Sequence, residues 1–262
     1  MTTPAALVTG GGTRLGAAFA RYLADKGFDI ALHYNSSREQ AQQVQAEIIA
    51  GGRRCELLQW DFLASDDPAA LLDQALQLLP NLQLLLNSAS VYDAAPTGQT
   101  TLELLQQQFK VNCFTPFLLT ARFAEKVGKG QVINILDNKI AYQQYHYSAY
   151  LLSKKSLADF TTMAAMEFAP AMRVNGIAPG VVMPGVVRTS DYIDWRVDGI
   201  PLKRQGSTDN LCQALGYLID NDFVTGQCLF VDGGEGINHI GRNAETYSAV
   251  TRSAQQSDED QQ

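Results

Sequence analysis

The sequence predicts an α/β fold, in which a doubly wound, seven-stranded parallel sheet carries helices on both faces within a single domain. Short hydrophobic segments alternate with helix-like patterns along most of the 262 residues. Segments such as 84–86 and 132–135 are continuous hydrophobic runs rather than alternating ones, which is typical of strands covered on both faces. The repeated strand–helix order favours right-handed crossover connections, and these generate the doubly wound architecture.

The hydrophobic periodicity places the elements in order along the chain. Strands are expected at residues 5–9, 28–34, 55–61, 82–88, 131–136, 172–178 and 228–232. Helices are expected at residues 15–26, 37–50, 67–79, 101–127, 147–169 and 207–220. Residues 181–206 form a longer connection than usual, rich in Pro and Gly, and we expect a substrate loop there. The domain is expected to span residues 1–242, and the polar residues 243–262 to form a mobile tail.

Charge, hydrophobic patterning and cysteine spacing exclude several classes of protein. The chain carries 20 Lys and Arg against 27 Asp and Glu, whereas nucleic-acid and anionic-membrane binders need a basic face. No hydrophobic run approaches the roughly 18 residues of a membrane span, and no signal peptide precedes the first expected strand. The four cysteines lack metal-ligand spacing, which favours free thiols, no metal site and a reducing compartment. We therefore expect a cytoplasmic protein whose partner is a small molecule, and neither nucleic acid nor membrane.

A glycine-rich turn follows the first expected strand, where residues 9–16 read Thr-Gly-Gly-Gly-Thr-Arg-Leu-Gly. Glycines let the backbone approach a diphosphate, which the free N–H groups and the dipole of the helix N-terminus then hold. Such a turn alone could be only a tight turn, but its position between a strand and a helix predicts a Rossmann-type dinucleotide site. The cofactor contacts expected in this turn are Gly10, Thr13, Arg14, Leu15 and Gly16.

The end of the second expected strand selects between NAD and NADP. NAD enzymes usually carry an acid there, which accepts hydrogen bonds from the ribose 2′-hydroxyl. Here residues 33–38 read His-Tyr-Asn-Ser-Ser-Arg, and no carboxylate occurs before Glu39. Hydroxyl and guanidinium groups bind phosphate, so the sequence predicts NADP(H). Ser36 or Ser37 could also cap the following helix, and the two roles are compatible. The expected contacts are His33, Tyr34, Asn35, Ser36 and Ser37.

Asp61 ends the third expected strand, at the same edge of the sheet. Its carboxylate could accept a hydrogen bond from the adenine amino group of the cofactor, or it could cap the turn that follows.

Tyr150 and Lys154 are four residues apart in an expected helix and therefore lie on one face of it. A lysine in this position can lower the proton affinity of the tyrosine through its charge, which would make Tyr150 a proton donor or acceptor near neutrality. Such pairs are common on protein surfaces. This pair, however, follows the expected strand 131–136, whose carboxyl end should face the cofactor crevice.

These motifs resemble the short-chain dehydrogenase/reductase family over residues 5–235. The resemblance rests on the glycine turn, Asn87-Ser88-Ala89-Ser90, Asn112, the Tyr150/Lys154 pair, Pro179-Gly180 and Val231-Asp232-Gly233-Gly234. It implies that Tyr150 is the general acid, that Lys154 binds the nicotinamide ribose and tunes Tyr150, and that Asn112 holds a proton-relay water. It further implies a homotetramer, and the hydrophobic faces of the expected helix at 147–169 predict a subunit interface there. The resemblance also implies cofactor contacts at Phe62, Asn87, Ser88, Ala89, Pro179 and Gly180.

Three departures from the family pattern resemble the pteridine reductases, which reduce pterins and folates with NADPH and include bacterial dihydromonapterin and dihydrofolate reductases. Arg14 replaces the middle glycine of the turn, and residues 87–90 read Asn-Ser-Ala-Ser instead of Asn-Asn-Ala-Gly. Asp137 stands thirteen residues before Tyr150, where most members carry a catalytic serine. The His-Tyr pair that ends the second strand and the aromatic Tyr92 fit the same subgroup.

The chemistry of these residues agrees with a pterin substrate. A serine at position 137 would donate to a carbonyl oxygen that gains negative charge, whereas a carboxylate repels such an oxygen. Asp137 suits a substrate that offers N–H donors and needs a proton at a ring nitrogen. Arg14 could reach the pterin carbonyl or the N5 side, Tyr92 could stack on the flat ring, and Ser90 could bond its edge. As alternatives, Tyr92 could be only a wall residue and Asp137 only a helix cap.

The sequence therefore predicts NADPH-dependent reduction of a dihydropterin or dihydrofolate to its tetrahydro form, with proton delivery by Tyr150 and Asp137. One rival hypothesis is a short-chain reductase of another carbonyl substrate, such as a 3-oxoacyl thioester or a quinone. The other is a regulatory protein that binds NADP without catalysis. Asp137 and Arg14 argue against the first rival, and the complete set of Tyr150, Lys154 and Asn112 argues against the second.

Overall fold

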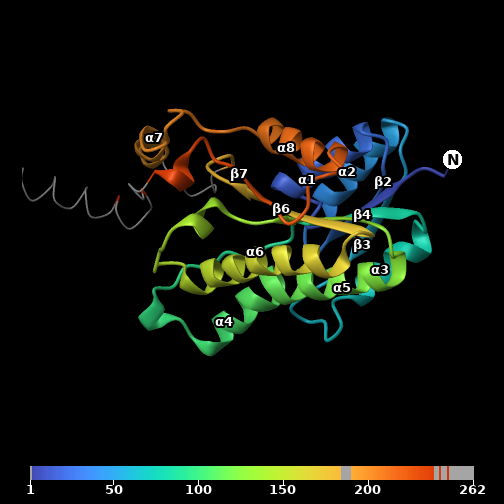
Figure 1. The fold of residues 1–262 in the computed structure, drawn as a ribbon, viewed down its shortest axis with the longest axis horizontal. Coiled ribbons are helices and arrows are strands. Elements are labelled where there is room, and N and C mark those ends of the chain that lie inside the picture. Colours follow the sequence, from blue (N-terminus) through green and yellow to red (C-terminus); the bar gives the residue numbers. More distant parts are fainter. Residues whose placement is uncertain (1, 184–189, 239–241, 243–246, 248–262) are drawn as a thin grey trace, which may run out of the picture.

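The computed structural model describes residues 2–183, 190–238, 242 and 247, and it confirms the predicted fold class (Figure 1). Seven parallel strands form one sheet in the order β3-β2-β1-β4-β5-β6-β7. The strand order reverses direction between β1 and β4, which lie side by side at the centre of the sheet. Such a switch point opens a crevice beyond the carboxyl ends of the strands, where ligands bind in folds of this type.

Each strand lies close to its predicted position. The strands are β1 Ala5–Thr9, β2 Asp29–Tyr34, β3 Cys55–Gln59, β4 Leu82–Asn87, β5 Gly130–Ile135, β6 Met172–Pro179 and β7 Cys228–Val231. All residues of β1 and β2 are buried, because helices cover both faces of the sheet. The continuous hydrophobic runs of the sequence therefore reflect burial on two sides.

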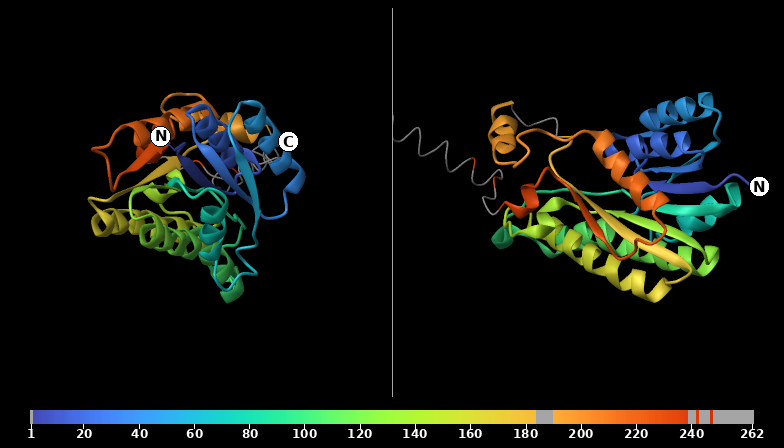
Figure 2. Two further views of the ribbon diagram at one scale, coloured as in Figure 1. Left: turned by 90° about the vertical axis from the view of Figure 1, so that its right-hand side faces the viewer. Right: turned by 45° about the horizontal axis from the view of Figure 1, so that its top comes forward.

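The helices form one layer on each face of the sheet, as Figure 2 shows. Their bounds are α1 Arg14–Asp25, α2 Arg38–Ala50, α3 Ala70–Leu78, α4 Leu102–Phe109, α5 Thr115–Val127, α6 Ser148–Phe168, α7 Ser190–Asp198 and α8 Thr208–Asp220. Ala6 and Val8 of β1 pack with α1, α2 and α8, whereas their neighbours Ala5 and Leu7 pack with α3, α5 and α6. Alternate residues of a strand thus supply two separate hydrophobic cores.

The expected single helix at 101–127 is interrupted. A π-helical segment, Lys110–Phe114, separates α4 from α5. Pro116, in the first turn of α5, has no backbone N–H to donate, so the α-helical hydrogen-bond ladder cannot pass through this point. The backbone N–H of Thr115 instead reaches the carbonyl oxygen of Lys110, five residues earlier. Bulges of this kind often occur at functional sites, and Asn112 lies within this one.

The expected substrate loop at 181–206 contains helix α7, which the sequence pattern did not reveal; residues 184–189 of that loop lie outside the described part of the chain. The expected polar tail at 243–262 also falls outside the described residues, apart from Tyr247. Within residues 2–183 and 190–238, no helix has both the length and the hydrophobicity needed to cross a bilayer. The four cysteines are free thiols, as expected, and three of them are buried.

Candidate active site

A cleft of about 680 Å³ opens at the carboxyl ends of the central strands. It brings together most of the residues predicted for the nicotinamide and substrate end of the site. These are Gly10, Thr13, Arg14, Leu15, Gly16, Ser88, Ala89, Ser90, Tyr92, Asp137, Tyr150, Lys154, Pro179 and Gly180. The other predicted site residues do not line this cleft. They are His33, Tyr34, Asn35, Ser36, Ser37, Asp61, Phe62, Asn87 and Asn112.

The glycine turn approaches the loop after β4 so closely that a side chain would not fit. Gly10 has a φ of 66°, and a Cβ there would lie 2.9 Å from the Cα of Ala89. The Thr9 hydroxyl oxygen, which sequence reasoning missed, accepts hydrogen bonds from the N–H groups of Ser88 and Ala89 at 2.9 and 3.1 Å. The turn and the loop therefore form one rigid floor across the switch point between β1 and β4.

Arg14 occupies the backbone position of the family's middle glycine, and the structure shows why glycine is usual there. Its φ is 49°, in the left-handed region that disfavours residues with a Cβ. The side chain compensates by reaching across the cleft, where Nη2 donates a hydrogen bond to the carbonyl oxygen of Met183. Strain of this kind is often retained at functional sites, and here it places a guanidinium group in the cleft.

The side chain of His33, which the sequence predicts as a cofactor contact, is only 2% exposed and does not line the cleft. Nδ1 accepts a hydrogen bond from the N–H of Gly10 at 3.0 Å, and Nε2 donates to the carbonyl oxygen of Trp60 at 3.0 Å. Burial lowers the pKa of His33 to about 4, so the imidazole stays neutral and Nδ1 remains an acceptor. His33 thus supports the glycine turn from below rather than touching a cofactor.

The other residues at the end of β2 separate into buried and exposed ones. Tyr34, predicted to contact the cofactor, has its side chain buried in the core beneath α1 and α2. Asn35 and Ser36 are exposed. Ser37 precedes α2 without making a side-chain cap, which removes that alternative for its hydroxyl. A Cβ at Gly12 would lie 2.7 Å from Ser37 Oγ, so this hydroxyl faces the glycine turn.

Asp61 takes the capping role that the sequence left open. Its Oδ1 accepts hydrogen bonds from the N–H groups of Leu63 and Ala64 at 2.8 and 3.4 Å. Phe62, beside it, is buried and packs against the His33 ring, with 4.4 Å between the ring centroids. The Phe62 side chain therefore belongs to the support of the glycine turn.

Tyr150 and Asp137 form the central contact of the cleft. Tyr150 Oη donates a hydrogen bond to Asp137 Oδ2 at 2.8 Å. Asp137 Oδ1 accepts from the backbone N–H of Lys139 at 2.8 Å and caps the short helix η3, Asn138–Ala141. The carboxylate therefore serves both as a helix cap and as the partner of the tyrosine, and its predicted role toward substrate stays a prediction.

The expectation that Lys154 lowers the pKa of Tyr150 is not met. Burial and the negative charge of Asp137 raise the pKa of Tyr150 well above its ordinary value. Lys154 Nζ lies 6.0 Å from the centre of the tyrosine ring and donates to the carbonyl oxygen of Ile135 at 2.8 Å. Burial lowers the pKa of Lys154 itself to about 8. Tyr150 is thus a neutral hydroxyl at physiological pH.

The side chain of Asn112 is bonded to the protein at both ends, and the relay water that the resemblance assigns to this residue stays a prediction. Its Oδ1 accepts from the N–H of Val91 at 2.9 Å and from Ser90 Oγ at 3.0 Å. Its Nδ2 donates to Val91 O, Gln108 Oε1 and Ser153 Oγ. Asn112 therefore fastens the loop after β4, including Ser90, to α4 and α6.

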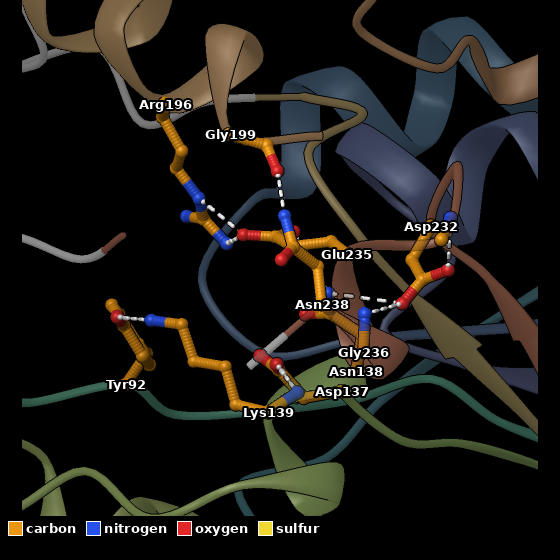
Figure 3. A network of polar contacts seen from close by, with 11 residues as sticks. Tyr92, Asp137, Asn138, Lys139, Arg196, Gly199, Asp232, Glu235, Gly236 and Asn238 are labelled. Atoms are coloured by element: carbon orange, nitrogen blue, oxygen red, sulfur yellow. Dashed lines mark hydrogen bonds and ion pairs between the residues drawn. The ribbon is translucent and has the colours of Figure 1, made fainter. Parts of the chain in front are cut away.

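An aromatic cluster forms one wall of the cleft. The Tyr92 ring stacks on Tyr147 with centroids 4.3 Å apart and meets Tyr150 edge-on at 4.5 Å. Lys139 Nζ donates to Tyr92 Oη at 3.3 Å (Figure 3) and lies over both the Tyr92 and the Tyr147 rings. Sequence reasoning missed Tyr147 and Lys139. Their proximity in sequence to Asp137 and Tyr150 was the only available signal.

Asn87 lies beneath the floor of the cleft instead of lining it. Its Nδ2 donates to Asn134 Oδ1 at 2.8 Å, and Asn134 Nδ2 donates to Thr161 Oγ1 at 2.9 Å. This buried chain joins β4, β5 and α6. Within the described part of the chain, the Asn87 Oδ1 atom is buried without a hydrogen-bond partner.

Known proteins are similar to this chain in sequence. Residues 4–192 match the short chain dehydrogenase family. The chain belongs to this family. It is 32% identical over 239 residues to an uncharacterised oxidoreductase of Mycobacterium tuberculosis, with 87% of this chain and 90% of that protein covered. It is 26% identical to the dihydromonapterin reductase of Escherichia coli, with 87% of this chain and 95% of that protein covered.

Solved structures of short-chain dehydrogenases include similar folds. FolM alternative dihydrofolate reductase 1 from Brucella suis, in complex with NADP, is similar to this chain with a TM-score of 0.85 and 30% sequence identity. The similarity covers 89% of this chain and 95% of that chain. These relatives are consistent with the pteridine reductase subgroup, and they identify this short-chain dehydrogenase as an oxidoreductase.

The role of His33 predicts a specific pH dependence of stability in this short-chain dehydrogenase. Between about pH 6.5 and about pH 4, the unfolded chain binds a proton at His33 that the folded chain does not bind. The free energy of unfolding should therefore fall as the pH drops through this range, by about 3 kcal/mol. A His33→Asn variant, whose amide oxygen can still accept from Gly10 N–H but does not titrate, should lose that slope. Urea unfolding between pH 7 and pH 4 measures both proteins, and equal slopes would contradict the assignment.

Proposed function

We propose that this short-chain dehydrogenase reduces a dihydropterin or dihydrofolate to its tetrahydro form with NADPH. The observation that carries the proposal is the hydrogen bond from Tyr150 Oη to Asp137 Oδ2 inside the cleft. The names of two relatives, a dihydromonapterin reductase and an alternative dihydrofolate reductase, support the same substrate class.

The residues of the cleft fit a dinucleotide. The glycine turn lies between β1 and the N-terminus of α1 and lines the cleft, where its backbone would lie against a diphosphate. At the end of β2, the Ser37 hydroxyl and the exposed Arg38 stand where an NAD enzyme carries an acid, so they would hold a 2′-phosphate. Lys154 would hold the nicotinamide ribose, and Pro179 and Gly180 would line the ring. NADPH, when bound, would supply the hydride.

Tyr150 is suited to donate a proton. Its raised pKa keeps the hydroxyl protonated at physiological pH, and Asp137 fixes the direction of the O–H bond. Reduction of a C=N bond places a hydride on carbon and a proton on nitrogen. A basic ring nitrogen beside Tyr150 would compete with Asp137 for this proton, and the tyrosine would then be reprotonated by way of the carboxylate.

Asp137 also selects the class of substrate. Its carboxylate attracts N–H and amino groups, whereas it would repel the alkoxide that forms when a ketone is reduced. Arg14 extends into the same cleft and would donate to a carbonyl oxygen on the ring. Tyr92 is covered by Tyr147 on one face but is 39% exposed, so its remaining surface would stack on a flat ring.

We also propose that the chain forms a homotetramer, as its family resemblance implies. Large hydrophobic side chains are exposed on the outer surfaces of α5 and α6, namely Phe117, Leu118, Met163 and Met166. Exposed groups of this kind mark association surfaces.

The cofactor assignment predicts at least about a tenfold preference for NADPH over NADH in kcat/KM, equivalent to about 1.4 kcal/mol. Removal of the phosphate ligands in a Ser37→Ala, Arg38→Ala double variant should reduce this preference, because the 2′-phosphate loses its partners. Steady-state kinetics with both cofactors measure the effect. Arg21→Ala, which removes an exposed arginine that pairs with Glu47, is the control and should keep the preference. Equal efficiency of the wild-type enzyme with NADH would contradict the assignment.

Replacement of Tyr150 by Phe should lower kcat by about a hundredfold or more, because the proton donor is lost. NADPH binding and the circular dichroism spectrum should be retained. Tyr145→Phe removes the hydroxyl of an exposed tyrosine outside the cleft and is the matched control. Near wild-type turnover of the Tyr150 variant would show that another group delivers the proton.

Asp137→Ser should separate a pterin reductase from an ordinary carbonyl reductase. The substitution removes the charge that orients N–H groups and introduces a donor that suits an alkoxide. The ratio of kcat/KM for a dihydropterin to kcat/KM for a simple ketone should therefore fall relative to wild type. An unchanged ratio would restrict Asp137 to its capping role on η3 and leave the substrate class undecided.

A further inference from the structure

A buried ion pair forms part of the cleft on the side of α7 (Figure 3). Arg196, on α7, donates from Nε and from Nη2 to Glu235 Oε1, and both distances are 2.9 Å. Glu235 begins the short helix η4, Glu235–Ile237, which follows β7. The two residues are only 5% and 7% exposed. Burying two charges carries a high desolvation cost, so the position of this pair inside the protein calls for a functional explanation.

The ion pair is connected to the catalytic turn. The second carboxylate oxygen of Glu235, Oε2, accepts a hydrogen bond from Asn138 Nδ2 at 2.8 Å. Asn138 follows Asp137 directly in the chain and is itself buried. The position of Arg196 is therefore tied, through Glu235 and Asn138, to the position of the carboxylate that holds Tyr150.

The segment that carries Arg196 is also fixed by backbone contacts. The carbonyl oxygen of Gly199, just after α7, accepts from Asn238 Nδ2 at 2.5 Å. The N–H of Leu202 donates to the carbonyl oxygen of Gly233 at 3.1 Å. Both partners lie on the segment that follows β7, so α7 and η4 are joined at three points. A side chain held in this way is preorganised for binding.

The contacts of Arg196 leave one edge of its guanidinium group available. Nε and Nη2 face Glu235, whereas Nη1 makes no hydrogen bond with any residue in the described part of the chain. Arg196 lines the same cleft as Asp137 and Tyr150. A guanidinium N–H that is withdrawn from bulk water favours an acceptor oxygen as its partner. Because Glu235 neutralises the charge of Arg196, a hydroxyl or carbonyl oxygen suits this edge better than a carboxylate does.

We propose that Arg196, held by Glu235, is a substrate-binding residue that donates a hydrogen bond to an uncharged oxygen on the substituent of the pterin ring. This inference rests on the proposed pterin reductase function. Asp137 and Arg14 would bind the polar edge of the pterin ring. The oxygen that Arg196 binds would therefore belong to the substituent of the ring. The residue would thereby favour pterins with a hydroxylated side chain over pterins with an aliphatic one.

The test compares two dihydropterins, one with a trihydroxypropyl side chain and one with a methyl group in its place. Arg196→Lys keeps the ion pair with Glu235 but loses the planar fork and its Nη1 edge. We expect the KM for the hydroxylated pterin to rise by about tenfold, and the KM for the methylated pterin to change by less than about twofold. Arg122→Lys, in the ion pair with Asp73 on α5 and α3, is the matched control.

A second variant tests the proposal in case the side chain in Arg196→Lys still donates a hydrogen bond to the substrate. The Arg196→Gln, Glu235→Gln double variant removes both charges together and therefore leaves no unpaired buried carboxylate. It should show the same selective rise in KM. An equal rise for both pterins, or no rise in either variant, would overturn the role of Arg196. A selective rise for the methylated pterin would overturn the preference for a hydroxylated side chain. If the wild-type enzyme reduces neither pterin and does not reduce dihydrofolate, the proposed function itself fails.

Discussion

The carboxylate of Asp137 is held at the end of β5 by Tyr150 Oη and by the backbone N–H of Lys139, and the polar groups of the cleft are arranged around it. A negative charge in a partly buried position must be matched by donors and cations. Lys154 interacts with this charge electrostatically, and Asn138 connects the same turn to the buried pair of Glu235 and Arg196. This one carboxylate therefore orients the tyrosine and lies in the turn that connects to α7 through Asn138 and Glu235.

The Asp137 contact also determines how protons are handled. Within its family, a tyrosine beside a lysine is expected to lose its proton more readily, but here burial and the Asp137 charge raise the pKa of Tyr150. Such a hydroxyl is a poor base and releases its proton only to a group that competes with the carboxylate. A ring nitrogen that gains basicity during reduction meets this requirement better than a ketone oxygen next to a negative charge. The electrostatics of the cleft and the proposed substrate class thus support each other.

On the cofactor side, buried side chains shape the backbone instead of touching the ligand. Alternation along β2 places His33 on the same face as Ala31 and Phe62, under the glycine turn, whereas Tyr34 joins the core on the opposite face with Leu32. The sequence identified this strand end correctly as important but assigned both side chains to the cofactor. Whether His33 or Tyr34 supports the turn depends on the register of β2 against β3, and that register cannot be derived from a single sequence.

The sequence by itself determined the sheet and its helices, because hydrophobic periodicity records which faces are buried. It also determined the glycine turn and the Tyr150/Lys154 pair, since both depend only on local spacing. The tertiary structure alone decided the Tyr92–Tyr147 stack and the Arg196–Glu235 pair. In each of these pairs the partners lie far apart in the chain. Their contact arises from how loops at the carboxyl ends of different strands converge, and local sequence patterns carry no record of that convergence.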